Sequence, residues 1–182
     1  DKNKIYPNTS YLLMAMEEGP RENGWYNEKI AEQALKDPEN AKNEYTEKIK
    51  ERLIYFKDNL DYTIDFYIKK ISSMWTENTY SAVIYNKIDE NNLIEKISSP
   101  LAFYQKASLI TLCVCCIIVL IQNRKNISLE IIFLLTIFIG GFAFHILWEA
   151  KSRYIIPYII VLIPIASISI NKFKFGKNKK RG

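Results

Sequence analysis

The chain has little cysteine and little histidine. Its three cysteines, Cys113, Cys115 and Cys116, all fall inside one apolar run, and His145 is its single histidine. A disulfide framework in the polar half is therefore excluded. A CxCC cluster can bind metal, but no histidine or carboxylate lies near it in the sequence. We interpret the cysteines as small apolar residues of a membrane helix, and neither a metal site nor any other cofactor is evident.

Several sequence features that would identify a class of protein are also missing. The chain opens Asp1-Lys2-Asn3-Lys4 without an initiator methionine, and no apolar segment of the signal-peptide type follows. We therefore expect it to be part of a longer protein. There is no internal repeat and no long Gly/Ser linker, and no serine or cysteine stands at a telling spacing from a base. Nucleophilic catalysis thus has no support.

Charge divides the chain into two halves. Residues 1–100 carry 14 Lys+Arg and 18 Asp+Glu, a net charge of −4. Residues 101–182 carry 11 Lys+Arg and 2 Asp+Glu, a net charge of +9. A basic total can indicate nucleic-acid binding, but here the positive charge lies at the ends of apolar runs. Membrane topology explains that pattern better, and we expect no nucleic-acid partner.

Three apolar runs follow the polar half, at about 101–122, 131–148 and 154–170. A membrane span needs about 20 mostly apolar residues. The second and third runs are somewhat short for that, and the uncharged part of the first begins only at Ala107. Flanking Lys, Trp and Tyr side chains would complete each crossing. We predict three transmembrane helices within 101–171.

Basic residues in the loops predict the orientation. Arg124 and Lys125 lie between the first two runs, and the tail 172–182 has six basic residues. The positive-inside rule places both on the cytoplasmic side of the cell membrane, so residues 1–100 are expected to be extracytoplasmic. The short loop 149–153, with two cations and one anion, would also lie outside. Positive charge on the outer side of the membrane departs from the positive-inside rule, so these two cations call for an explanation.

Some residues of the apolar runs are typical of packed helices. Gly140-Gly141 permits close approach, and Pro157 and Pro164 free backbone carbonyls that neighbours must satisfy. We therefore predict a mainly α fold: a helical extracytoplasmic segment, then three transmembrane helices that end a larger polytopic helical bundle and pack against upstream helices. A neutral, hydrogen-bonded His145 fits this better than a metal ligand.

Helix signals recur in the polar half. Asp37 is a good N-cap and Pro38 suits the first helical position, so a helix is predicted from there to about Lys57. The other predicted elements are helices over 60–73 and 28–35, turns at Gly19-Pro20 and Asn23-Gly24, and a loop over 75–100 that returns to the membrane.

One stretch carries a family resemblance. Residues 145–158 read HILWEAKSRYIIPY and follow Gly140-Gly141-Phe142. This stretch resembles the C-terminal end of bacterial multi-spanning membrane glycosyltransferases of the GT-C superfamily, relatives of the protein mannosyltransferases and the lipid A aminoarabinose transferases. Pieces within 10–26, 49–53 and 66–76 also look similar to that group.

The resemblance implies an enzyme that transfers a sugar from a polyprenyl phosphate to a cell-envelope glycan or protein at the outer membrane face. In that group the catalytic carboxylate lies in the first external loop, in the N-terminal half. No residue of this chain matches it. We therefore expect no catalytic residue here and no activity from the chain alone.

The loop after the second apolar run has suitable chemistry for a lipid-phosphate donor. Arg153 can hold a phosphate bidentately and Lys151 is a compact point charge. Trp148 and Tyr154 can anchor at the interface or stack on a sugar. If the helix continues, Glu149 shares a face with Arg153 and orients it. The predicted donor-phosphate site is Lys151, Arg153 and Tyr154, supported by His145, Trp148 and Glu149.

Two alternatives stay open. In the first, Lys151 and Arg153 contact the phosphates of bulk lipids and not a donor, and Trp148 and Tyr154 belong to the aromatic belt of the membrane. The whole protein can also be a non-catalytic polytopic membrane protein, such as a polysaccharide polymerase, a flippase or a transporter component. A transporter should carry polar groups on broken helices near the midplane, whereas the charges here cluster at the outer face. The sequence names neither the sugar nor the acceptor.

Overall fold

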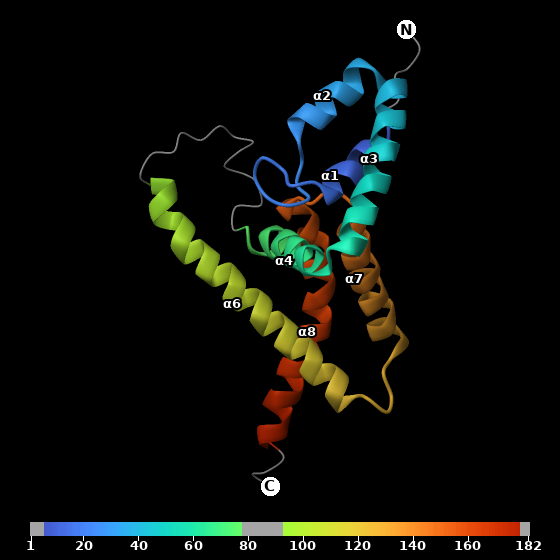
Figure 1. The fold of residues 1–182 in the computed structure, drawn as a ribbon. Helices are drawn as coiled ribbons and strands as arrows, with labels where there is room; N and C mark the ends of the chain where they lie inside the picture. The colour runs from blue at the N-terminus through green and yellow to red at the C-terminus, as the bar shows by residue number, and fades with distance from the viewer. Residues whose placement is uncertain (1–5, 78–92, 179–182) are drawn as a thin grey trace. The chain divides into compact units, whose positions relative to one another are not determined.

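The computed structural model of the chain describes residues 6–77 and 93–178 (Figure 1). Over these residues the regular elements are all helical, which confirms the mainly α prediction. In chain order they are α1 (Thr9–Met16), α2 (Glu28–Lys36), α3 (Pro38–Asp58), α4 (Leu60–Thr76), α6 (Leu93–Gln122), α7 (Leu129–Leu147), the 3-10 helix η1 (Ser152–Ile155) and α8 (Ile156–Asn178). They form two compact units, and α7 contributes residues to both.

The first unit comprises residues 1–75 and 143–152. The predicted start of α3 is confirmed: the Asp37 carboxylate accepts a hydrogen bond from the Asn40 amide at 3.3 Å, and Pro38 stands at the first helical position. The fully buried Tyr45 of α3 donates its hydroxyl to the Ile30 carbonyl of α2 at 2.9 Å. Helices α1, α2 and α3 thus share one core, built around Leu13, Ala34, Ala41 and Tyr45.

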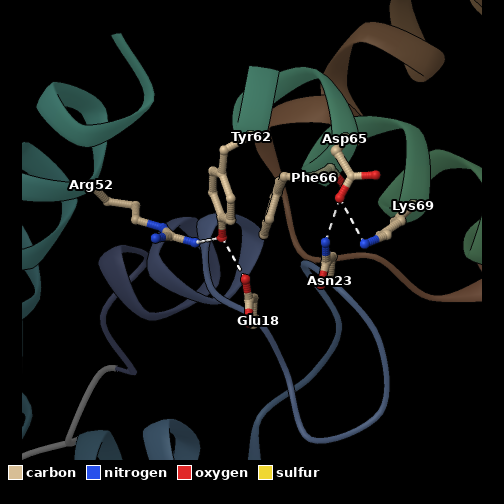
Figure 2. A network of polar contacts seen from close by, with 7 residues as sticks. All are labelled: Glu18, Asn23, Arg52, Tyr62, Asp65, Phe66 and Lys69. Atoms are coloured by element: carbon tan, nitrogen blue, oxygen red, sulfur yellow. Dashed lines mark hydrogen bonds and ion pairs between the residues drawn. The ribbon is translucent and has the colours of Figure 1, made fainter. Parts of the chain in front are cut away.

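Arg52 joins three helices of this unit (Figure 2). Its Nε donates to the Met16 carbonyl of α1 at 2.7 Å, and its terminal nitrogen donates to the Tyr62 hydroxyl of α4 at 2.5 Å. Tyr62 in turn donates to Glu18 at 2.6 Å. The guanidinium also lies 4.8 Å from the centroid of the Phe56 ring, a cation–π contact. One side chain of α3 therefore fixes both α1 and α4.

The second unit comprises residues 76–142 and 153–182. Its core is an apolar cluster from α6, α7 and α8: Cys116, Val119, Ile131, Leu162, Ile165 and Ala166. The Cys116 thiol lies 3.6 Å from the Leu162 carbonyl and is buried in this cluster, Cys115 is half-buried, Cys113 is exposed, and all three are free. Helix α6 begins at Leu93 and contains Pro100, so the predicted loop is wrong for 93–100. The sequence LIEKIS carries the helix into the apolar run, and a membrane helix tolerates proline. Residues 78–92 of the predicted loop lie outside the described ranges.

Two helices of the described ranges are long and apolar enough to cross a membrane, Pro100–Gln122 within α6 and Leu129–Leu147, which is α7. Only 17% and 11% of their most apolar windows are buried, unlike the core helix of a soluble protein. Both agree closely with predicted spans. The apolar part of the third, Ser152–Ile168, is shorter, so three spans stay a prediction.

Candidate functional site

Helix α7 ends at Leu147, close to the predicted end of the second span at 148, so the condition under which Glu149 and Arg153 would share a helical face is not met. In a continuing helix the Ile146 carbonyl would accept from the Ala150 amide. Instead Ala150 donates to the Gly24 carbonyl at 2.7 Å, and Ile146 accepts from the Lys70 ammonium at 2.8 Å. The backbone groups released at the helix end are thus satisfied by side-chain and main-chain partners from α4 and the loop after α1.

Lys70 is the centre of this arrangement. Its Nζ also donates to the carbonyls of Ala15 at 3.0 Å and Trp148 at 2.9 Å, so all three ammonium protons have main-chain acceptors. The side chain is 1% exposed, and burial lowers the pKa of Lys70 to about 7. A single buried side chain therefore connects α1, α4 and the end of α7.

Gly24 makes room for that lysine. Its φ of +73° lies in the left-handed region, and a Cβ there would stand 2.5 Å from the Lys70 Cδ. The predicted Asn23-Gly24 turn is therefore confirmed, and only glycine suits it. The next residue, Trp25, forms a parallel bridge with Ala150. The turn thus aligns the chain after α7 with the loop after α1.

Trp148 stacks on two aromatic rings. Its centroid lies 5.1 Å from that of Tyr11 in α1 and 5.2 Å from that of Phe144 in α7. His145 is buried in the last turn of α7, and its ring meets Phe144 edge-on at 5.2 Å. Trp148 is therefore held by protein contacts both at its main-chain carbonyl and at its ring. A tryptophan that only anchors a helix in the aromatic belt of the membrane does not need so many protein contacts.

Glu149 and Lys151 form an ion pair at 2.7 Å, with side-chain exposures of 1% and 13%. The Lys151 ammonium also lies 4.7 Å from the centroid of the Tyr26 ring. A buried carboxylate needs such compensation, because removing a charge from water is costly. Glu149 is thus paired with Lys151.

Arg153 and Tyr154 belong to the second unit, in η1. The Arg153 guanidinium lies 5.8 Å from the ring centroid of Tyr154, and it is exposed. The structure therefore brings four of the six predicted site residues together in the first unit: His145, Trp148, Glu149 and Lys151. Within residues 6–77 and 93–178, no group of three or more His, Cys, Asp or Glu side chains could hold a metal ion.

The main residue that sequence reasoning missed is Lys70. The available signal was its position between Phe66 and Met74, four residues from each, on the buried face of α4. A lysine on an apolar face without a nearby carboxylate indicates a main-chain partner. Comparison with known proteins adds no further site residue: no protein family, curated protein or solved structure matches the chain.

Proposed function

We propose that the chain is the C-terminal portion of a membrane glycosyltransferase that uses a polyprenyl-phosphate-linked sugar at the outer face of the cell membrane. The proposal is supported by the resemblance of residues 145–158 to the GT-C group and by one structural observation. The segment Trp148–Lys151 is fixed by three elements of the first unit, the loop around Gly24, α1 and α4. A loop that only joins two spans has no need of such support.

The chemistry of this segment and of the residues that follow suits a sugar phosphate. Lys151 and Arg153 supply positive charge at the end of an apolar helix. Tyr26 presents an aromatic ring next to the Lys151 charge, and such rings stack well on the apolar face of a sugar. In this proposal Lys151, Arg153 and Tyr154 bind the donor phosphate, while His145, Trp148 and Glu149 position them.

The proposal includes a topology and partners. We infer that 101–171 crosses the membrane three times, that 1–100 is extracytoplasmic, and that the basic tail is cytoplasmic. Lipids and further transmembrane helices of the same protein would cover the exposed apolar side chains of α6 and α7. The catalytic carboxylate would be contributed by the part of the protein that precedes this chain.

A second function has a specific observation in its favour. The Lys151 charge is already compensated by the buried Glu149, as a purely structural pair would be. A non-catalytic polytopic membrane protein, such as a polysaccharide polymerase, flippase or transporter component, is therefore the alternative.

Transfer assays separate the two. Membranes containing the full-length protein are incubated with radiolabelled polyprenyl-phosphate sugars, with Arg153→Ala and Arg153→Lys beside the wild type. Arg124→Ala is the matched control, since it removes an exposed arginine from the predicted cytoplasmic loop. We expect transfer by the wild type and the control, loss in Arg153→Ala, and a weaker donor interaction in Arg153→Lys because lysine cannot bind bidentately.

Two outcomes would contradict the proposal at different levels. Unchanged transfer in Arg153→Ala, at normal membrane levels of the protein, would remove Arg153 from the donor site. An absence of transfer from every donor tested would favour the non-catalytic alternative.

A further inference from the structure

Helix α4 has three distinct faces. Its buried face contains Phe66, Lys70 and Met74, four residues apart. A second face is aliphatic, with Leu60, Ile64, Ile68 and Ile71 at positions i, i+4, i+8 and i+11. A third face is polar and comprises Asp61, Asp65, Lys69, Ser72 and Thr76. A helix that packed only against its own unit and water would need two faces, so the aliphatic one calls for a separate explanation.

The aliphatic face is uncovered within its unit. Leu60, Ile64 and Ile68 are 66%, 60% and 60% exposed. Together with Ile71 they form a stripe of large aliphatic side chains over three turns of helix. Scattered exposed apolar residues are ordinary, but a contiguous stripe of this kind marks a contact surface.

The buried face fixes the position of α4 along the membrane normal. Lys70 donates to the carbonyls of Ile146 and Trp148, which stand at and just after the last turn of α7. Helix α7 is one of the two helices that are long and apolar enough to cross a membrane. Its end therefore marks the boundary of the hydrocarbon, and α4 is held at that level.

We propose that α4 is an interfacial helix, which lies on the membrane surface where α7 emerges and inserts Leu60, Ile64 and Ile68 into the boundary between headgroups and acyl chains. Its polar face, led by Asp61, Asp65 and Lys69, stays in water. Figure 2 shows Asp65 and Lys69 as an ion pair on α4, 2.7 Å apart, beside the inward-pointing Phe66.

The charges of α4 specify which property of the membrane it recognises. Most interfacial helices carry Lys and Arg on the polar face and gain affinity from anionic lipids. Here two aspartates outnumber one lysine on that face, so electrostatic attraction to anionic lipid contributes nothing. The contact is therefore with the apolar layer of the bilayer, and it should persist in zwitterionic lipid and at high salt. This inference requires only that α7 spans the membrane and is independent of the glycosyltransferase proposal.

Site-directed spin labelling tests it in the intact protein. Single cysteines replace Ile64, Ile68, Asp65 or Lys69 in a background with Cys113, Cys115 and Cys116 changed to Ser, reconstituted in zwitterionic lipid nanodiscs. All four positions are exposed, so the label should fit without disturbing the core. Collisions of each label with oxygen, which concentrates in the bilayer, and with a water-soluble nickel chelate are then compared.

We expect labels at 64 and 68 to collide with oxygen and to be shielded from nickel, and labels at 65 and 69 to show the reverse, with the same pattern in nanodiscs that contain anionic lipid. Nickel access at all four positions would overturn the proposal, because α4 would then lie in water. Shielding of 64 and 68 from both reagents would also overturn it, because it would mean that protein covers this face, either another part of the chain or a second subunit.

Discussion

The ammonium nitrogen of Lys70 lies 2.9 Å from the carbonyl oxygen of Trp148, 78 positions further along the chain. The same nitrogen binds Ile146 and Ala15, so the end of a candidate membrane span is attached to α1 through α4. Nothing else in the described contacts joins these three segments through a single atom. The positions of Glu149 and Lys151 depend on it, because they follow directly from Trp148 in the chain.

Replacing Lys70 by methionine tests this role. Methionine keeps the apolar stem but leaves three carbonyls without their donor, and each buried unsatisfied acceptor costs about 1–3 kcal/mol. Loss of the buried charge offsets part of that cost, so we expect a net destabilisation of roughly 2 kcal/mol. Thermal unfolding of the purified protein in detergent measures it.

Lys69→Met is the matched control for Lys70→Met. The Lys69 side chain is 60% exposed and forms an ion pair with Asp65 one turn away. An exposed pair of this kind contributes little to stability because water and salt screen it, so Lys69→Met should have a much smaller effect than Lys70→Met. Equal effects of the two substitutions would contradict the assignment of Lys70 as the central hydrogen-bond donor.

The stability of the protein should depend on pH through Lys70. Burial lowers the pKa of its ammonium from 10.5 to about 7 in the folded state. Between those two values the unfolded chain binds more protons than the folded one, so this group makes stability rise with pH across that window. We expect the melting temperature of the wild type, relative to Lys70→Met, to increase from about pH 7 to about pH 9.

Buried tyrosines do not affect this comparison, because both proteins contain them and they ionise only at higher pH. Burial raises the pKa of Tyr6 to about 12 and also raises those of Tyr45, Tyr62 and Tyr67, so their contribution is lost only as the pH rises above about 10. If the difference in melting temperature between wild type and Lys70→Met did not change with pH below about 10, Lys70 would have its ordinary pKa in the folded protein.

Gly24→Ala should destabilise the first unit for two separable reasons. The left-handed φ of +73° costs a residue with a Cβ about 1–2 kcal/mol, and the new methyl would lie 2.5 Å from Lys70 Cδ. In a double-mutant cycle, Lys70→Ala removes the steric conflict and leaves only the backbone cost. We therefore expect Gly24→Ala to cost less in the Lys70→Ala background, as measured by thermal unfolding. If the effects of the two substitutions on stability were additive, the close approach of Gly24 to the Lys70 side chain would be contradicted.

Local signals predicted much of the fold. The N-cap Asp37 with Pro38 located the start of α3, and the apolar run 131–148 located α7 within two residues, because both features depend on neighbouring residues. The Asn23-Gly24 turn was predicted for the same reason. The signals for these elements lie within the segments themselves, so the sequence could reveal them.

The candidate site could not be predicted to the same extent. Whether α7 continues beyond Leu147 depends on the Lys70 ammonium and the Gly24 carbonyl, which are distant in sequence and compete for its backbone groups. The contacts that hold residues 148–151 after the end of α7 therefore could not be predicted from the sequence. The pairing of Glu149 with Lys151 follows from the same long-range contacts.

Two adjacent glycines of α7 should respond differently to substitution. A Cβ on Gly141 would overlap the ring of Tyr158 in α8, whereas a Cβ on Gly140 would meet nothing within 4 Å. We predict that Gly141→Ala separates α7 from α8 and destabilises the second unit by about 1–3 kcal/mol, the usual cost of overpacking. Gly140→Ala is the control and should be close to neutral. Cysteine cross-linking between α7 and α8, compared in the two variants, would detect the separation, and identical cross-linking would contradict this packing.

The buried ion pair distinguishes a structural from a donor-binding role of Lys151. Lys151→Met leaves the Glu149 carboxylate buried without its cation, which typically costs about 3–5 kcal/mol. Adding Glu149→Gln removes that charge, so the double variant should recover most of the lost melting temperature. If Lys151 also binds the donor phosphate, the stable double variant will still need far more donor for half-maximal transfer than the wild type. Restored transfer in the double variant would instead limit Lys151 to compensating Glu149, and would leave Arg153 as the cation to test at the donor phosphate.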